Sequence, residues 1–254
     1  MVSETVGKLA EGLDNKSGKK AVKYSIAFDG VLPFDLNVFT SPSYASEDVA
    51  LPEAVMNHVK KENNHKNIYV MDRGLQSTRT IKTFSKDNVA FICRVKENRK
   101  YVELESLITK NQNCDLGESI LIKDCKVQLY TGIQINNKRG KTHNKEELVN
   151  QNFRLVIVQS KVQQDKQFYL LTNNFEISAK EIAQAYRRRW DIEVFFRFLK
   201  QEINAIHLVS LNKNGIQVML YMTLIVAILL LIYKKANKIG YKTAKEGFQW
   251  RLET

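Results

Sequence analysis

A chain of 254 residues with 44% hydrophobic residues is long enough to bury a substantial core, so intrinsic disorder is not the default. Lysine and arginine number 39 against 27 acidic residues, and the net charge of +12 favours a polyanionic partner, either nucleic acid or an anionic membrane surface. The three cysteines and four histidines lack the spacing of a disulfide framework or a zinc site. The amino-terminal residues do not resemble a secretory signal, and we expect a cytoplasmic protein.

The first predicted elements are two β-rich runs, residues 21–28 and 31–39, on either side of Asp29-Gly30. A turn signal of this type between two β-rich runs predicts an antiparallel hairpin. Asp48 then precedes the run LPEAVMNHVKK, which predicts a short helix with a capping acid near its start.

A compact strand, NIYVMD, follows and ends on Asp72. Arg73-Gly74 breaks the chain, residues 78–84 favour a helix, and VAFICRV predicts another strand. This is a strand, helix, strand unit with an acid at the carboxyl end of its first strand. Ligands collect at this edge of open α/β sheets, so Asp72 is a candidate site residue.

From about residue 99 to residue 171, short β-type runs alternate with polar stretches, which predicts a β-rich region inserted into the α/β fold. A helix is then predicted from Ser178, as N-cap, through about Ile203. The run from Ile216 to Tyr233 is nearly all apolar, but it is slightly short for a membrane span and contains a glutamine. We expect a buried core helix there, with a membrane-anchored protein as the alternative.

Four polar residues share one narrow stripe of the predicted helix. At about 100° per residue from Tyr186, three others lie within 60° of it: Arg189, Glu193 and Lys200. The two flanks of the stripe are apolar, Trp190, Val194 and Phe198 on one side and Ile192, Phe196, Leu199 and Ile203 on the other, which predicts burial on both.

Charged residues between two buried flanks are costly unless they meet one another, a metal ion or a bound anion. A purely structural alternative is an internal salt bridge from Arg189 to Glu193, with Lys200 on the surface.

The spacing Tyr186, Arg189, Glu193, Lys200 resembles the Tyr-Arg-Glu-Lys signature of DDE transposases from bacterial insertion sequences, in particular insertion-sequence family four. Two further stretches are similar to motifs of this family: Asp72-Arg73-Gly74 at a strand end, and Asn214 to Gln217 before an apolar helix. The resemblance covers roughly residues 20–233.

The resemblance implies an α/β fold with a ribonuclease H-like core interrupted by a β-rich insertion, in agreement with the pattern of predicted elements. We expect an N-terminal part of the core over 1–97, the β-rich insertion over 98–172, a C-terminal part of the core with the glutamate helix over 173–235, and a basic tail over 236–254.

By resemblance, Asp72 and Glu193 are the second and third acids of a metal-binding triad, and the metal would be Mg²⁺ or Mn²⁺, which prefer hard oxygen ligands. The resemblance also implies that Tyr186, Arg189 and Lys200 contact phosphates of the transposon ends, with Arg73 as a further DNA-binding residue. Two divalent ions can activate the attacking oxygen and stabilise the leaving oxygen of a phosphodiester.

In the family, the first acid lies on a strand that precedes the predicted hairpin. Asp14 is in a loop-like sequence, EGLDNKSGKK, and for Asp29 and Asp35 we prefer structural roles. We therefore hypothesise that the chain begins within this strand or just past it, without the first acid and without any N-terminal DNA-recognition domain.

These observations predict the catalytic domain of a DNA transposase that cleaves and joins phosphodiesters at transposon ends, and the absence of the first acid would leave it inactive. The alternative is a catalytically silent, DNA-binding remnant. The expected partners are double-stranded DNA and a second copy of the chain bound on DNA, and no membrane, which implies a cytoplasmic, nucleoid-associated location.

Overall fold

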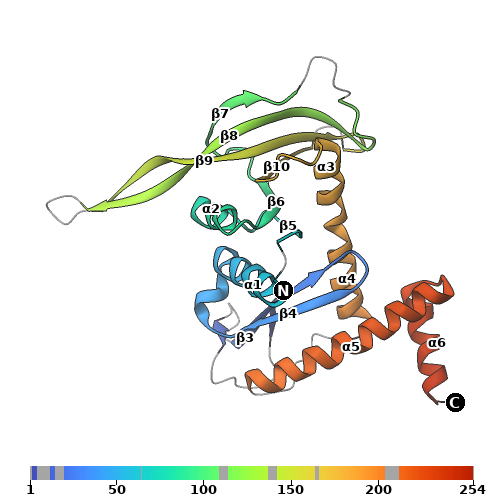
Figure 1. The fold of residues 1–254 in the computed structure, drawn as a ribbon. Helices are drawn as coiled ribbons and strands as arrows, with labels where there is room; N and C mark the ends of the chain where they lie inside the picture. The colour runs from blue at the N-terminus through green and yellow to red at the C-terminus, as the bar shows by residue number, and fades with distance from the viewer. Residues whose placement is uncertain are drawn as a thin grey trace. The chain divides into compact units, whose positions relative to one another are not determined.

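The computed structural model describes residues 2–4, 12–14, 20–63, 65–108, 114–136, 142–163, 166–203 and 212–253 (Figure 1). Its internal contacts divide the chain into two compact units. Unit 1 comprises residues 1–54 and 190–254, and unit 2 comprises residues 55–189. The predicted boundaries between the core and the β-rich insertion stay a prediction.

The sheet of unit 1 is built around β3 (Lys20–Phe28). Strands β4 (Pro33–Phe39) and β2 (Leu13–Asp14) pair antiparallel with one edge of β3, and β1 (Val2–Glu4) pairs antiparallel with the other. The predicted β3–β4 hairpin is confirmed. Asp29 forms its turn, because Oδ1 accepts hydrogen bonds of 2.7 Å from the amides of Val31 and Leu32, and Gly30 supplies a φ of 97°.

Helices of unit 1 pack on both faces of this sheet. Helices α4 (Trp190–Gln201) and α5 (Lys213–Asn237) share a core with alternate residues of β3 and β4, and the core includes Tyr24, Leu36 and Phe195. After the 3₁₀ turn η1 (Pro42–Ala45), the first half of α1 (Glu47–Glu62) packs against Phe39, which faces the opposite way from Val38. The last helix, α6 (Tyr241–Glu253), lies within the predicted basic tail.

Helix α5 is buried along one face only. Residues such as Leu220 and Ala227 belong to the core of unit 1, whereas Val218 and Met222 are 60% and 58% exposed. By length and composition α5 could cross a membrane, and 33% of its most apolar window is buried. One such helix is weak evidence for a span, because core helices of soluble proteins meet the same criterion. The expectation of a buried core helix therefore holds for one face and is wrong for the other.

Unit 2 contains a six-stranded sheet in the order β5-β6-β10-β9-β8-β7. Strands β5 (Ile68–Met71) and β6 (Ala90–Val95) are parallel and are joined by α2 (Thr78–Lys86), as predicted for the strand, helix, strand unit. The other four strands are antiparallel and come from the predicted β-rich region: β7 (Tyr101–Ser106), β8 (Ser119–Asn136), β9 (Thr142–Ser160) and β10 (Gln167–Thr172).

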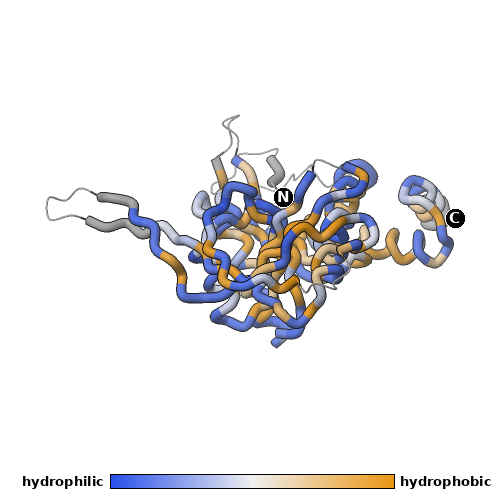
Figure 2. Tube along the Cα trace, turned by 90° about the horizontal axis from the view of Figure 1, so that it is seen from above, coloured by the Kyte–Doolittle hydropathy of each residue, from blue (hydrophilic) through white to orange (hydrophobic). Residues whose placement is uncertain are grey.

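Strands β8 and β9 form a long hairpin whose inner and outer parts differ. The inner part (residues 119–130 and 148–160) continues the sheet through β10, while the outer part (residues 131–136 and 142–147) runs beyond the other strands (Figure 1). The residues of the outer part that Figure 2 colours are hydrophilic. Among the residues whose burial the structure describes, the inner part contributes to the cores of unit 2.

The sheet of unit 2 has a helix on each face. Side chains alternate along β9, so Leu155 and Ile157 pack with α2, whereas Val156 and Val158 pack with α3 (Ala179–Arg188). Both faces are therefore apolar, and the sheet is the middle layer of the unit. The predicted fold class, α/β, is confirmed.

The predicted helix from Ser178 to Ile203 is interrupted. Helix α3 ends at Arg188 and α4 begins at Trp190, and between them the amide of Arg189 donates to the carbonyl of Tyr186, three residues earlier, at 3.1 Å. At this tighter turn the regular bonding to the fourth preceding residue is interrupted, while Arg189 keeps a right-handed helical conformation, with φ −53° and ψ −26°. The break coincides with the boundary between the two units.

Candidate active site

Asp72 is the first residue after β5, at the carboxyl end of a parallel strand pair. Met71, the last residue of the strand, is buried, whereas the side chain of Asp72 is 60% exposed. Its Oδ1 accepts a hydrogen bond of 2.7 Å from the amide of Arg73. A backbone hydrogen bond thus restrains the carboxylate of Asp72, while its oxygens remain accessible to solvent.

The loop after Asp72 is tied to the β-rich region. The guanidinium of Arg99 donates to the carbonyl of Gln76 at 2.9 Å and to the hydroxyl of Thr78 at 2.7 Å. The Thr78 hydroxyl in turn donates to the carbonyl of Tyr130, on β8, at 2.7 Å. Ser77 caps α2 by accepting the amide of Thr80. These bonds define the path of the chain from Asp72 into α2.

Tyr186 lies in the last turn of α3 and faces Asp72 from the same unit. Only 7% of the residue is exposed, its ring contacts Phe168 with centroids 6.3 Å apart, and its hydroxyl donates to Oδ1 of Asp72 at 3.5 Å. Burial, and then the charge of Asp72, raises the pKa of the Tyr186 phenol above its ordinary value. The phenol is therefore a proton donor at neutral pH.

Arg189 completes this group within unit 2. Its guanidinium lies 5.7 Å from the ring centroid of Tyr186, and Nη1 is 3.8 Å from Oδ2 of Asp72. The side chain is 17% exposed, so the charge is held largely out of water. A distance of 3.8 Å permits an ionic attraction but is too long for a hydrogen bond. The acid, the phenol and the guanidinium thus meet within unit 2. The residues of the stripe were expected to meet one another, a metal ion or an anion, and the helical periodicity did not indicate Asp72 as their partner.

The other two signature residues, Glu193 and Lys200, lie on α4 in unit 1, where Glu193 is half-buried and Lys200 is exposed. The predicted burial of both flanks is wrong for Trp190, which is 54% exposed. Phe195, which was assigned to neither flank, is fully buried. Both residues belong to α4, beyond the break at Arg189.

A family model described as the transposase DDE domain matches residues 4–229. The chain belongs to this transposase family. A putative transposase for insertion sequence element IS4SA from Synechocystis is 28% identical over 179 residues, which are 69% of this chain and 43% of that protein. A probable transposase for insertion sequence element IS5377 from Geobacillus stearothermophilus is 28% identical over 167 residues, 66% of this chain and 39% of that protein.

The transposase domain thus spans less than half the length of these two relatives. Among solved structures, the piggyBac transposase synaptic complex with hairpin DNA aligns over 92% of this chain and 45% of its own, at 12% identity and a TM-score of 0.44.

Metal ligands in the transposase domain would be carboxylates. Among the residues that the structure describes, no group of three or more histidine, cysteine, aspartate or glutamate side chains is placed to hold an ion. Asp72 offers accessible carboxylate oxygens, and its contacts with Tyr186 and Arg189 are long. Hard oxygen donors suit Mg²⁺ or Mn²⁺, so the chemistry of Asp72 fits such an ion.

Three aspartates near the N-terminus were candidates for the first acid of the triad, and two of them have other roles. Asp29 forms the hairpin turn, and Asp35 accepts a hydrogen bond of 2.9 Å from the side-chain amide of Asn37, so the structural roles expected for both are confirmed. For Asp14 the structure describes the backbone, in β2.

The sequence pattern missed two buried charges of the transposase domain, Asp124 on β8 and Arg154 on β9. Arg154 lies in the otherwise apolar run FRLVIV, whereas Asp124 lies between Lys123 and Cys125 in the mixed stretch KDCK. For Arg154, a polar residue at an inward position of such an apolar run was the available signal. Their pairing depends on the register of two strands about thirty residues apart, and the spacing alone does not give that register.

Proposed function

We propose that this chain is the catalytic domain of a transposase that uses divalent metal ions to cleave and join phosphodiesters at transposon ends. The observation that carries the proposal is the meeting of Asp72, Tyr186 and Arg189 at the carboxyl end of β5, which combines an exposed acid with a buried phenol and guanidinium. These three residue types are those of the family motif, on two segments far apart in the sequence.

Asp72 and Glu193 are the proposed metal ligands. When bound, Mg²⁺ or Mn²⁺ would supply activation of the attacking oxygen and stabilisation of the leaving oxygen. The role of the protein is to orient both carboxylates. For Asp72, the amide of Arg73 donates to one oxygen, and Nη1 of Arg189 lies 3.8 Å from the other.

Tyr186 and Arg189 are the proposed phosphate contacts next to the metal site. The phenol keeps its proton at neutral pH and can donate to a phosphate oxygen, and the planar guanidinium can donate two parallel hydrogen bonds. Lys200 and Arg73, both exposed, would add point charges along the DNA backbone. The low exposure of Arg189 strengthens its attraction for a phosphate.

The proposed partner is double-stranded DNA, including transposon ends and target, bound by two copies of the chain. The net charge of +12 supports a polyanionic partner, because neutralised phosphates release counterions and so favour binding. We assign the protein to the cytoplasm in association with the nucleoid.

The test is cleavage of supercoiled plasmid by the purified chain with Mn²⁺. Asp72→Asn and Glu193→Gln remove one ligand charge each at nearly constant size. Asp191→Asn removes the same charge from the first turn of α4, two residues from Glu193, and is the matched control. We expect nicking by the parent and the control, and none by the two ligand variants or with a chelator.

Two results would change the proposal. Nicking that survives both ligand substitutions would place the activity elsewhere. DNA retention by the parent without nicking, equal in metal and in chelator, would support the catalytically silent DNA-binding remnant.

A further inference from the structure

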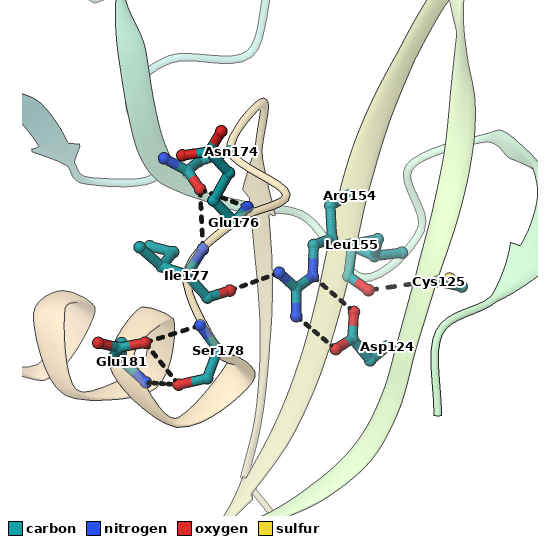
Figure 3. A network of polar contacts seen from close by, with 9 residues as sticks. All are labelled: Asp124, Cys125, Arg154, Leu155, Asn174, Glu176, Ile177, Ser178 and Glu181. Carbon is teal, nitrogen blue, oxygen red and sulfur yellow. Dashed lines mark hydrogen bonds and ion pairs between the residues drawn. The ribbon is translucent and has the colours of Figure 1, made fainter. Parts of the chain in front are cut away.

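A buried ion pair joins the two long strands of unit 2 on the face that carries α3. Nε and Nη2 of Arg154 donate to Oδ1 and Oδ2 of Asp124 at 2.8 and 2.7 Å (Figure 3). The side chains of Arg154 and Asp124 are 7% and 1% exposed. Both carboxylate oxygens are therefore occupied by one guanidinium, in the parallel two-bond geometry that is specific to arginine.

The third nitrogen of the Arg154 guanidinium does not bond to Asp124 and instead contacts the segment at the start of α3. Nη1 donates to the carbonyl of Ile177 at 2.6 Å (Figure 3). Ile177 immediately precedes Ser178, the N-cap of α3, which forms a reciprocal capping box with Glu181. The side chain of Asn174 accepts the Ile177 amide at 3.1 Å. The peptide groups before the helix are therefore fixed on both sides, and Arg154 links them to β9.

Two other contacts hold α3 against the same strands. Ile182, in the middle of the helix, packs in a core with Val156 and Val158 of β9. At the far end, the guanidinium of Arg187 pairs with Glu118, although both side chains are well exposed. Exposed ion pairs contribute little, so of these polar contacts the buried one, at the start of the helix, is the stronger directional restraint.

The energetics of the Asp124–Arg154 pair indicate that its role is to orient α3 rather than to stabilise the folded protein. Replacing a buried ion pair with apolar residues of similar volume is often neutral or stabilising, because two charges must lose their hydration. The guanidinium of Arg154 also makes a third hydrogen bond, to the segment just before α3. Hydrogen bonds are directional, so this bond can fix the orientation of the helix, which apolar side chains cannot do. Tyr186 lies eight residues beyond Ser178, roughly 12 Å along the helix axis, so the helix transmits a tilt at its start to the phenol.

We propose that Arg154 is a positioning residue, which sets the start of α3 on the β8–β9 hairpin and thereby holds Tyr186 against Asp72. The inference rests on the proposed function for the roles of Tyr186 and Asp72, but the placement of α3 can be measured without any activity. The inner part of the β8–β9 hairpin would then support the active site, in addition to forming part of the sheet.

The test replaces the pair by apolar residues, Arg154→Met with Asp124→Leu, in the full chain. We expect this double variant to keep its unfolding temperature while the amides of Glu181 and Ile182 exchange with solvent about tenfold faster, as expected for the loss of one hydrogen bond to a charged group. The ring signals of Tyr186 in a tyrosine-labelled sample should move, whereas those of Tyr44, in unit 1, should not.

The matched control is Lys100→Gln with Glu146→Gln, which removes an exposed ion pair of unit 2, with bonds of 2.8 and 2.9 Å, between the residue before β7 and β9. It should leave amide exchange and the Tyr186 signals unchanged. If the apolar double variant behaves like this control, with unchanged exchange at Glu181 and Ile182, Arg154 is merely structural and the proposal is overturned.

If the double variant fails to fold, Arg154→Lys decides the question. Lysine keeps a positive charge beside Asp124 but cannot bond the carboxylate twice and Ile177 once in the same geometry. Faster exchange at the start of α3 with a folded core supports the proposal, and unchanged exchange refutes it.

Cleavage gives a separate readout. If the parent chain cleaves DNA, the apolar double variant should have a kcat about tenfold lower and an unchanged KM. A tenfold rate change corresponds to the loss of about one hydrogen bond to a charged group. If the parent does not cleave, the proposed function fails while the exchange and ring-signal measurements still test Arg154.

Discussion

The hydroxyl of Tyr186 can be separated from its ring, because each has its own contacts. Tyr186→Phe removes only the hydroxyl, whose bond to Asp72 is 3.5 Å long and ends on a 60% exposed carboxylate. Such a bond contributes at most about 1 kcal/mol to the free energy of unfolding. Tyr186→Ala also removes a ring that is 7% exposed and packs near Phe168, which should cost roughly 3 to 5 kcal/mol.

Thermal unfolding followed by circular dichroism measures this difference. For a chain of this size, the alanine variant should lower Tm by roughly 6 to 20 °C and the phenylalanine variant by no more than about 4 °C. Plasmid cleavage is then measured below both unfolding temperatures. We expect Tyr186→Phe to lose most cleavage despite its stability, because the phosphate contact needs the phenolic proton. Loss of stability as large as that of Tyr186→Ala, or full cleavage by Tyr186→Phe, would refute this reasoning.

Three further predictions concern the cap of α3, a buried thiol and the outer face of α5. Ser178→Ala should lower the free energy of unfolding by about 1 kcal/mol in a denaturant titration, whereas Ser41→Ala, at an N-cap without a side-chain cap bond, should change it by less than about 0.5 kcal/mol. Burial raises the pKa of the Cys125 thiol to about 11, so iodoacetamide should label it at pH 8 only after unfolding, as mass spectrometry would detect. Leu220→Lys should destabilise the protein by several kcal/mol and Met222→Lys by less than about 0.5 kcal/mol, since they are 3% and 58% exposed; equal losses would favour a membrane span.

Elements with strong local signals were predicted from the sequence with their approximate limits. The β3–β4 hairpin follows from Asp29-Gly30 between two β-rich runs, and the capped start of α3 follows from Ser178 with Glu181 three residues later. In both cases the determining residues are within a few positions of one another. The order of the strands in unit 2 required tertiary contacts and was not predicted.

The break at Arg189 shows that a periodic pattern does not establish one unbroken helix. Tyr186, Arg189 and Glu193 fall on one stripe of a continuous helix, and their spacing resembles the family motif. In the structure, one tighter turn separates Arg189, which lies beside Asp72, from Glu193, which belongs to unit 1. The motif spacing is thus compatible with two helices, because the chemistry depends on side-chain positions rather than on an unbroken hydrogen-bond ladder.

Asp72 and Tyr186 are 114 residues apart, and the sequence between them contains the entire β-rich region. Local patterns identified each residue, but their meeting depends on contacts that no local pattern contains: Thr78 with the carbonyl of Tyr130, and Arg154 with the carbonyl of Ile177. Both contacts lead to the inner part of the β8–β9 hairpin, one to each face of the sheet. A hairpin that anchors the acid on one face and the phenol-bearing helix on the other fixes their relative position, which a loop of the same length could not do without a large entropic cost.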